Sequence, residues 1–177
     1  MKQKGLVIVF TGEGKGKTSA ALGIAMRACG HKMYVSMVQF IKGPSKTGEE
    51  AASERLSPEF EFIPMGRGFV TSSKTGVPLS EHKRAAEDAL LLACQRAQSG
   101  SWDVLILDEI NNAIKLGLLD LKDVVDLVRN KPEKLHLILT GRDAHPDIIA
   151  LADMVTEMRA VKHPYDRGIP AQQGIDF

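Results

Sequence analysis

The feature that most constrains the fold is a glycine-rich loop between a short apolar run and an alanine-rich stretch. Leu6 to Phe10 is continuously apolar, which is typical of a parallel strand covered on both faces. The loop follows as Thr11-Gly12-Glu13-Gly14-Lys15-Gly16-Lys17-Thr18. Lys17 to Gly30 then carries apolar residues at helical spacing and stops at a glycine. A buried strand that turns directly into a helix favours a parallel sheet.

The loop has the residue types of a phosphate-binding loop. The generic pattern is G-x-x-x-x-G-K-[ST], and Gly16-Lys17-Thr18 supply its end. Thr11 stands where the first glycine is expected, and glycine comes one residue later, at Gly12. Glycines let successive backbone N–H groups turn towards phosphate oxygens, and the start of the helix adds its positive end.

The side chains of the loop indicate a nucleoside triphosphate with Mg²⁺. Lys17 brings a positive charge to the phosphates, Thr18 offers a hydroxyl to the metal ion, and Lys15 is an additional cation. The alternative is a glycine-rich surface turn, which the position between strand and helix disfavours. The predicted ATP-binding residues of the loop are Gly12, Glu13, Gly14, Lys15, Gly16, Lys17, Thr18 and Ser19.

Strand and helix patterns alternate along the whole chain. We predict one α/β domain over residues 1–177, a P-loop NTPase-like fold with a mainly parallel sheet of about six strands and helices on both faces. The loops near 42–48 and 65–78 are either functional lids or plain surface segments. The predicted strands are 6–10, 33–40, 60–63, 104–107, 135–139 and 154–161, and the predicted helices are 17–30, 48–56, 79–98, with Ser80 as its cap, 121–129 and 146–152.

Asp108-Glu109 is the second candidate for the metal site. The pair directly follows the apolar run Val104 to Leu107, and an acidic residue at the carboxyl end of a neighbouring strand holds Mg²⁺ in such folds. The alternative is that Asp108 caps a helix beginning at Ile110. Together with the phosphate loop, the metal interpretation is favoured, with Thr18, Asp108 and Glu109 as ligands.

Composition excludes several other classes of protein. Lys plus Arg number 23 against 22 for Asp plus Glu, so a net charge of +1 gives no general attraction to nucleic acid or an anionic membrane. Cys29 and Cys94 lie in apolar helical contexts and are expected to be buried thiols. The apolar runs are too short for a signal peptide or a membrane span, so we expect a cytoplasmic protein.

The sequence resembles the phosphate-loop family of ATP:corrinoid adenosyltransferases through nearly its whole length. Thr11 belongs to the resemblance, although it breaks the generic loop pattern. The similar segments are 9–18, 25–28, 30–31, Val38-Gln39-Phe40-Ile41-Lys42-Gly43, 48–49, Met65-Gly66-Arg67-Gly68-Phe69, 107–109, Thr140-Gly141-Arg142 with His145 and Asp147, 162–168 and 171–176.

The resemblance implies transfer of an adenosyl group. A corrinoid with cobalt reduced to Co(I) attacks the 5′ carbon of ATP and releases triphosphate. Co(I) is itself the nucleophile, which agrees with the lack of a visible catalytic triad. The family binds the triphosphate in an unusual direction, and Arg27 would help to hold the nucleotide. Lys17 and Thr18 would stabilise the departing triphosphate.

The resemblance also implies how Co(II) becomes reducible. The family places aromatic side chains under the corrin and enforces four-coordinate Co(II); Phe69 matches one such position, and Thr71 replaces a tryptophan that many members have. Many members also carry an N-terminal extension over the site, whereas only Met1 to Lys4 precede the first strand here. The corrinoid contacts implied are Met65, Gly68, Phe69, Arg142 and His163, and the partners implied are a second copy in a homodimer and an electron-donating reductase or flavoprotein.

Several assignments keep an alternative. Arg142 binds an acidic group of the substrate or forms a surface salt bridge. His145 and His163 have structural or substrate-orienting roles in preference to catalytic ones. Trp102 is expected to serve packing. For the whole chain, the alternatives are a P-loop NTPase or small-molecule kinase, and a non-catalytic nucleotide-dependent corrinoid-binding module.

Overall fold

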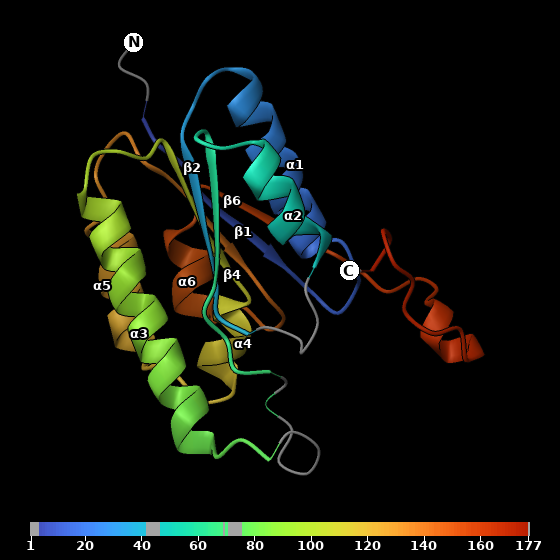
Figure 1. Cartoon of the computed structure of the whole chain (residues 1–177). Helices are drawn as coiled ribbons and strands as arrows, with labels where there is room; N and C mark the ends of the chain where they lie inside the picture. Colours follow the sequence, from blue (N-terminus) through green and yellow to red (C-terminus); the bar gives the residue numbers. More distant parts are fainter. Residues whose placement is uncertain (1–3, 42–46, 69, 71–75, 177) are drawn as a thin grey trace.

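The computed structural model describes residues 4–41, 47–68, 70 and 76–176, and within them strands and helices alternate (Figure 1). The strands are β1 (Val7–Thr11), β2 (Val35–Gln39), β3 (Phe60–Pro64), β4 (Val104–Asp108), β5 (His136–Thr140) and β6 (Met154–Glu157). The helices are α1 (Lys17–Gly30), α2 (Gly48–Arg55), α3 (Leu79–Gln98), α4 (Ile110–Lys115), α5 (Leu121–Arg129) and α6 (Pro146–Leu151), with a short 3₁₀ helix, η1 (Pro164–Arg167).

The described strands form one six-stranded sheet in the order β3-β2-β4-β5-β1-β6, and every pairing in it is parallel. Two registers matter for the site: Gln39 pairs with Asp108 across β2 and β4, and Phe10 pairs with Thr140 across β1 and β5. The predicted parallel α/β fold is therefore confirmed, and all its strands end at the same edge of the sheet.

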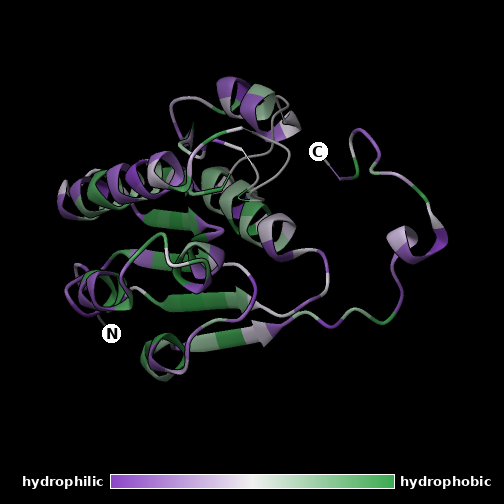
Figure 2. Cartoon of the chain, turned by 90° about the horizontal axis from the view of Figure 1, so that it is seen from below, coloured by the Kyte–Doolittle hydropathy of each residue, from purple (hydrophilic) through white to green (hydrophobic). Residues whose placement is uncertain are grey.

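Alternation of side chains along the strands explains why both faces of the sheet are covered. In β1, Val7 and Val9 pack into one core cluster, and Ile8 and Phe10 into another. The second cluster is completed by alanines of α1, and the first by α3 to α6, so the helices lie on opposite sides of the sheet (Figure 1). Figure 2 shows the central strands as the most uniformly hydrophobic part of the fold.

Some predicted details differ from the structure. Ser80 is not the cap of α3, because Pro78 with extended backbone takes that position and no side chain caps the helix. Asp108 does not cap a helix either; it ends β4, and Glu109 occupies the capping position of α4, which begins at Ile110 as the alternative for Asp108 expected. The last strand is shorter than predicted and is exposed along its length.

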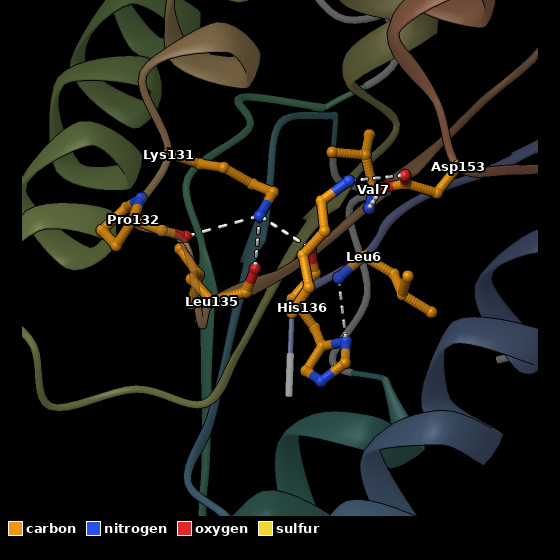
Figure 3. Close-up of polar contacts among 9 residues, drawn as sticks. Leu6, Val7, Lys131, Pro132, Leu135, His136 and Asp153 are labelled. Carbon is orange, nitrogen blue, oxygen red and sulfur yellow. Dashed lines mark hydrogen bonds and ion pairs between the residues drawn. The ribbon is translucent and has the colours of Figure 1, made fainter. Parts of the chain in front are cut away.

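The amino edge of the sheet is closed by polar contacts far from the glycine-rich loop (Figure 3). Lys131 Nζ donates to the carbonyl oxygens of Gly5 at 2.9 Å, Leu135 at 3.0 Å and Pro132 at 3.4 Å. Burial lowers the pKa of Lys131. The carboxylate of Asp153 accepts from the backbone N–H of Val7 at 2.8 Å. These contacts satisfy backbone groups at the beginning of β1 and in the loop that leads into β5.

The remaining expectations concern single residues and segments. Cys29 and Cys94 are free and half-buried, so no disulfide joins them. Trp102 packs partly buried against the core with the Arg96 guanidinium 5.7 Å from its ring centre, in agreement with a packing role. After β6 the chain extends beyond the carboxyl edge of the sheet (Figures 1 and 2). None of the described helices is long and apolar enough to cross a membrane.

Candidate nucleotide site

The glycine-rich loop connects β1 to α1, as predicted, and its geometry explains the displaced glycine. Thr11 is the last residue of β1, is buried, and accepts a hydrogen bond from the backbone N–H of Ala144 at 3.1 Å. The chain first needs positive φ at Gly12, where φ is +94°, and again at Gly16, where φ is +108°. A side chain is therefore compatible with position 11, whereas position 12 favours glycine.

The outer side of the loop packs against the chain that continues from β6. Gly14 N–H donates to the Met158 carbonyl at 2.7 Å, and Met158 N–H donates to the Thr11 carbonyl at 2.8 Å. A Cβ atom at Gly12 would lie 2.5 Å from the Met158 carbonyl oxygen. The segment after β6 thus holds the outer side of the loop in place. Its backbone can come this close because Gly12 has no side chain.

Lys17 begins α1 and its ammonium group lies inside the loop. Nζ donates to the carbonyl oxygens of Gly12 and Gly14, both at 2.7 Å, and the residue is 8% exposed. Burial lowers the pKa of Lys17, while the carboxylate of Glu109 opposes this effect. A buried ammonium held only by two neutral carbonyls is arranged to receive an anion.

Asp108 is the fully buried centre of a polar cluster at the carboxyl edge. Its Oδ1 accepts from Thr18 Oγ1 at 2.8 Å and from Thr140 Oγ1 at 2.7 Å, and its Oδ2 accepts from Gln39 Nε2 at 3.0 Å. Burial raises the pKa of Asp108, and these three hydrogen bonds oppose that shift. Because the Thr18 hydroxyl donates its hydrogen to Asp108, its oxygen lone pairs remain for a cation.

Glu109 follows in a strained backbone conformation with φ of 63°. Its N–H donates to Thr140 Oγ1 at 2.9 Å. Burial, reinforced by the charge of Asp108, raises the pKa of Glu109 to about 7, and the cations of Lys17 and Arg142 oppose the shift. A further cation that enters the site would lower the pKa of this carboxyl group and favour its ionised form.

The acidic strand and the loop strand are not adjacent, in contrast to the prediction that a neighbouring strand carries the acidic residue. β5 lies between β1 and β4. Thr140, at the end of β5, closes this gap by bonding both Asp108 and Glu109. Sequence reasoning did not select Thr140 as a site residue. Its position at the end of an apolar strand, before Gly141-Arg142, is the signal that could have identified it.

Two further predicted residues have partners beside the loop. Arg142 Nη1 pairs with Glu13 Oε2 at 3.1 Å, with both side chains more than half exposed. Arg142 therefore forms a salt bridge on the rim of the loop, one of its two predicted roles. The ammonium of Lys15 pairs with the carboxylate of Asp176, which returns to the loop from the end of the chain. Ser19 lies exposed in the first turn of α1.

Other predicted contacts are not brought to the loop. Arg27 is exposed in the last turn of α1, ten residues after Lys17 and thus about 15 Å along the axis. Met65 and Gly68 follow β3 at the carboxyl edge. Because β3 is the outermost strand beyond β2, it is separated from β1 by three strands. Phe69 and Thr71 lie outside the described residues.

The two histidines have local structural contacts. His145 Nδ1 accepts from Asp147 N–H at 3.2 Å at the beginning of α6. His163 Nδ1 accepts from Tyr165 N–H at 3.1 Å at the beginning of η1. Both side chains therefore cap short helices, which is one of the two roles expected for them.

The residues at the carboxyl edge offer oxygen atoms, the type of ligand that Mg²⁺ prefers. Among the described residues, no group of three or more His, Cys, Asp or Glu side chains is gathered to hold a metal ion. Thr18, Asp108 and Glu109 nonetheless lie around the amino end of α1. This donor set fits an ion that takes the rest of its ligands from phosphate oxygens and water.

Sequence comparison identifies related proteins over almost the whole chain. A family model described as ATP:corrinoid adenosyltransferase BtuR/CobO/CobP matches residues 3–177. A corrinoid adenosyltransferase of Pseudomonas aeruginosa is 41% identical over 175 residues, covering 99% of this chain and 85% of the relative. One from Escherichia coli K12 is 39% identical, covering 99% of this chain and 87% of the relative.

Structural comparison gives a more distant likeness. The flagellar accessory protein FlaH of Methanocaldococcus jannaschii superposes with a TM-score of 0.57 at 16% identity, covering 88% of this chain and 71% of that one. At this identity the likeness concerns the fold alone.

Proposed function

The chain belongs to the BtuR/CobO/CobP family of ATP:corrinoid adenosyltransferases, and we propose that the nucleotide site described above transfers the 5′-deoxyadenosyl group of ATP to a reduced corrinoid. In this reaction Co(I) forms a bond to C5′ as the C5′–O5′ bond breaks. The bonding electron pair leaves with the triphosphate, and cobalt becomes Co(III). The observation that carries the proposal is the phosphate loop with Lys17 inside it, joined through Thr18 to Asp108.

The residues of the loop act on the leaving group. No side chain has to serve as nucleophile, so the protein's task is to hold C5′ in line and to stabilise the charge that develops on O5′ and the phosphates. Lys17 exchanges the Gly12 and Gly14 carbonyls for phosphate oxygens. Lys15 reaches the triphosphate once it separates from Asp176.

Mg²⁺ completes the proposal for this end of the site. When bound, the ion neutralises negative charge on the triphosphate. Thr18 would hold it through its hydroxyl oxygen and Glu109 through its carboxylate. Asp108 accepts the Thr18 hydroxyl hydrogen, and because it is fully buried it would contribute to the metal site through Thr18 and bound water.

We infer that the corrinoid lies at the other side of the carboxyl edge, because the segment whose residues resemble the family's corrinoid contacts follows β3. Met65, Gly68 and Phe69 follow β3 and would meet the corrin, with Phe69 displacing an axial ligand from Co(II). Arg142 and His163 are further proposed corrinoid contacts, and Arg27 a nucleotide contact. These assignments rest on the similarity of the segments in which these residues stand.

The proposal extends to the setting of the reaction. Residues 1–177 act as a single catalytic domain, in the cytoplasm, as a homodimer. A reductase or flavoprotein supplies the electron that converts Co(II) to Co(I). Neither the NTPase or kinase alternative nor a non-catalytic binding module is favoured by the family to which the chain belongs.

The test is a spectroscopic assay with ATP, Mg²⁺ and a chemically reduced corrinoid. We expect the Co(I) spectrum to be replaced by that of a light-sensitive alkyl-cobalt product, with one triphosphate formed for each corrinoid consumed. Release of orthophosphate at the same rate with and without corrinoid would instead indicate an NTPase. Tight binding of both substrates without turnover would indicate a binding module.

A further inference from the structure

Gln39 lies beside the metal site but has no role in the function proposed so far. It is the last residue of β2, paired in register with Asp108 of β4. Its Nε2 donates to Asp108 Oδ2 at 3.0 Å. Its Oε1 is buried and has no hydrogen-bond partner among the residues that the structure describes. A buried amide oxygen without a donor costs about 1–3 kcal/mol, which calls for an explanation.

The orientation of this amide is fixed by its neighbour. An ionised carboxylate can only accept hydrogen bonds, so Gln39 must turn its NH₂ group towards Asp108. Its oxygen then remains as an acceptor. The same carboxylate accepts from the hydroxyl of Thr18, the proposed metal ligand, so both residues are bonded to one group.

The main chain of Gln39 bonds the segment that follows β3, the strand on the other side of β2 from β4. Its carbonyl oxygen accepts from the N–H of Met65 at 3.0 Å. Met65 begins the segment after β3 that is proposed to meet the corrinoid. One residue therefore bonds the carboxylate of the metal site with its side chain and the first residue of the corrinoid segment with its backbone.

We propose that Gln39 is a positioning residue whose Oε1 accepts a hydrogen bond from a water molecule on the nucleotide-bound Mg²⁺. This inference rests on the proposed function. Mg²⁺ in proteins keeps several of its waters, and each water is a hydrogen-bond donor. The donor that Oε1 lacks therefore arrives with the metal ion, which fixes the ion relative to the corrinoid segment.

The test compares metal binding in two variants. Gln39→Met keeps the length of the side chain but removes both hydrogen-bonding groups. Ser36→Ala is the matched control: Ser36 lies on β2, as Gln39 does, and the variant removes its part-buried hydrogen bond to Glu61 of β3. Binding of Mn²⁺ to the protein with ATP is measured by electron paramagnetic resonance. Binding of ATP in the presence of a chelator is measured by calorimetry.

We expect Gln39→Met to weaken Mn²⁺ binding by about tenfold or more, the range found for groups that contact the ligands of a metal. Metal-free ATP binding should stay at the wild-type value, and Ser36→Ala should change neither. A folded Gln39→Met protein with wild-type affinity for Mn²⁺ would overturn the inference, as would an equal loss in both measurements, since that indicates a merely structural role.

Two controls distinguish a failed role of Gln39 from misfolding of the variant and from failure of the proposed function. If circular dichroism shows that Gln39→Met is unfolded, the shorter Gln39→Asn is judged by the same criteria, because it withdraws the amide from its partners. The wild-type protein is assayed in parallel for adenosyl transfer. Absence of transfer by the wild type overturns the proposed function. If the wild type is active and Gln39→Met binds Mn²⁺ with wild-type affinity, only the role of Gln39 is overturned.

Discussion

At the scale of single residues, the site is organised around one carboxylate. Asp108 is fully buried and accepts hydrogen bonds from side chains on α1, β2 and β5. Since three elements contribute donors, the relative positions of these elements are tied to this group. Motif and context predicted Lys17, Thr18, Asp108 and Glu109. The sequence could not predict that Thr140 and Gln39 bond Asp108, because this depends on which strands are adjacent.

Lys17→Ala should reduce the rate of transfer severely while leaving the fold intact. The ammonium is the cation inside the loop, and removing one group that stabilises transition-state charge costs about 10²- to 10³-fold in rate. Initial rates at saturating ATP measure the effect, and circular dichroism checks the fold. Lys122→Ala, on the exposed surface of α5, is the control. Wild-type turnover in Lys17→Ala would refute the assigned role.

Glu109 should make the nucleotide-free and metal-free protein less stable as pH rises. Burial raises its pKa from 4.5 to about 7, so between these values the folded chain keeps a proton that the unfolded chain has lost. The free energy of unfolding therefore falls between about pH 4.5 and 7, by at most about 3 kcal/mol. Glu109→Gln should remove this part of the slope in denaturant titrations. Parallel pH profiles for variant and wild type would contradict the role of burial.

At the scale of elements, the loop depends on the segment that follows β6. Sequence periodicity predicted α1, α3 and α5 with the bounds that the structure has, because each carries a clear helical pattern between polar or glycine ends. It did not reveal that Met158 supports the loop through backbone hydrogen bonds, since such contacts leave no side-chain pattern. It also missed the capping position at Pro78, because Ser80 is the more usual type of capping residue.

Two glycine substitutions should have opposite effects on stability. Gly12→Ala places a Cβ 2.5 Å from the Met158 carbonyl oxygen at φ of +94°, and should destabilise the fold by about 1–3 kcal/mol. Gly23→Ala, within α1, meets nothing within 4 Å and should stabilise by about 0.5–1 kcal/mol. Chemical denaturation measures both. Equal stability of the two variants would contradict the close approach at Gly12.

The segment after β3 carries the proposed aromatic residue, Phe69. Phe69→Ala should reduce the rate chiefly when the assay begins from Co(II), because the side chain is proposed to favour four-coordinate Co(II). When preformed Co(I) is supplied, the loss should be smaller. The two assays are run on the same preparation with the same ATP concentration. Equal losses in both would count against the aromatic role.

At the scale of the whole molecule, the residues of the candidate site lie at one edge of the sheet, the carboxyl edge. All described strands are parallel, so the ends of β1, β4 and β5 meet, and the loop, Asp108 and Thr140 come together although they are far apart in sequence. The strand–helix alternation predicted a parallel sheet. It could not give the strand order, because alternation is the same whether β4 or β5 lies beside β1.

At this edge, the proposed triphosphate-binding loop and the proposed corrinoid segment follow different strands. The loop follows β1, while Met65 and Gly68 follow β3 at the far side of β2. A nucleotide that reacts at C5′ must extend from one to the other with its phosphates held in the loop. The central claim is therefore that the loop binds the triphosphate as a leaving group and does not transfer the terminal phosphate.

The most direct test uses ATP labelled with ¹⁸O at the oxygen that bridges C5′ and the α-phosphorus. The labelled ATP is incubated with the protein, Mg²⁺ and chemically reduced corrinoid, and the products are analysed by mass spectrometry. Cleavage of the C5′–O5′ bond predicts that all label leaves in intact triphosphate, in equal amount to the adenosylated corrinoid. Label retained in ADP or AMP would mean that a phosphorus–oxygen bond breaks, and would contradict the account.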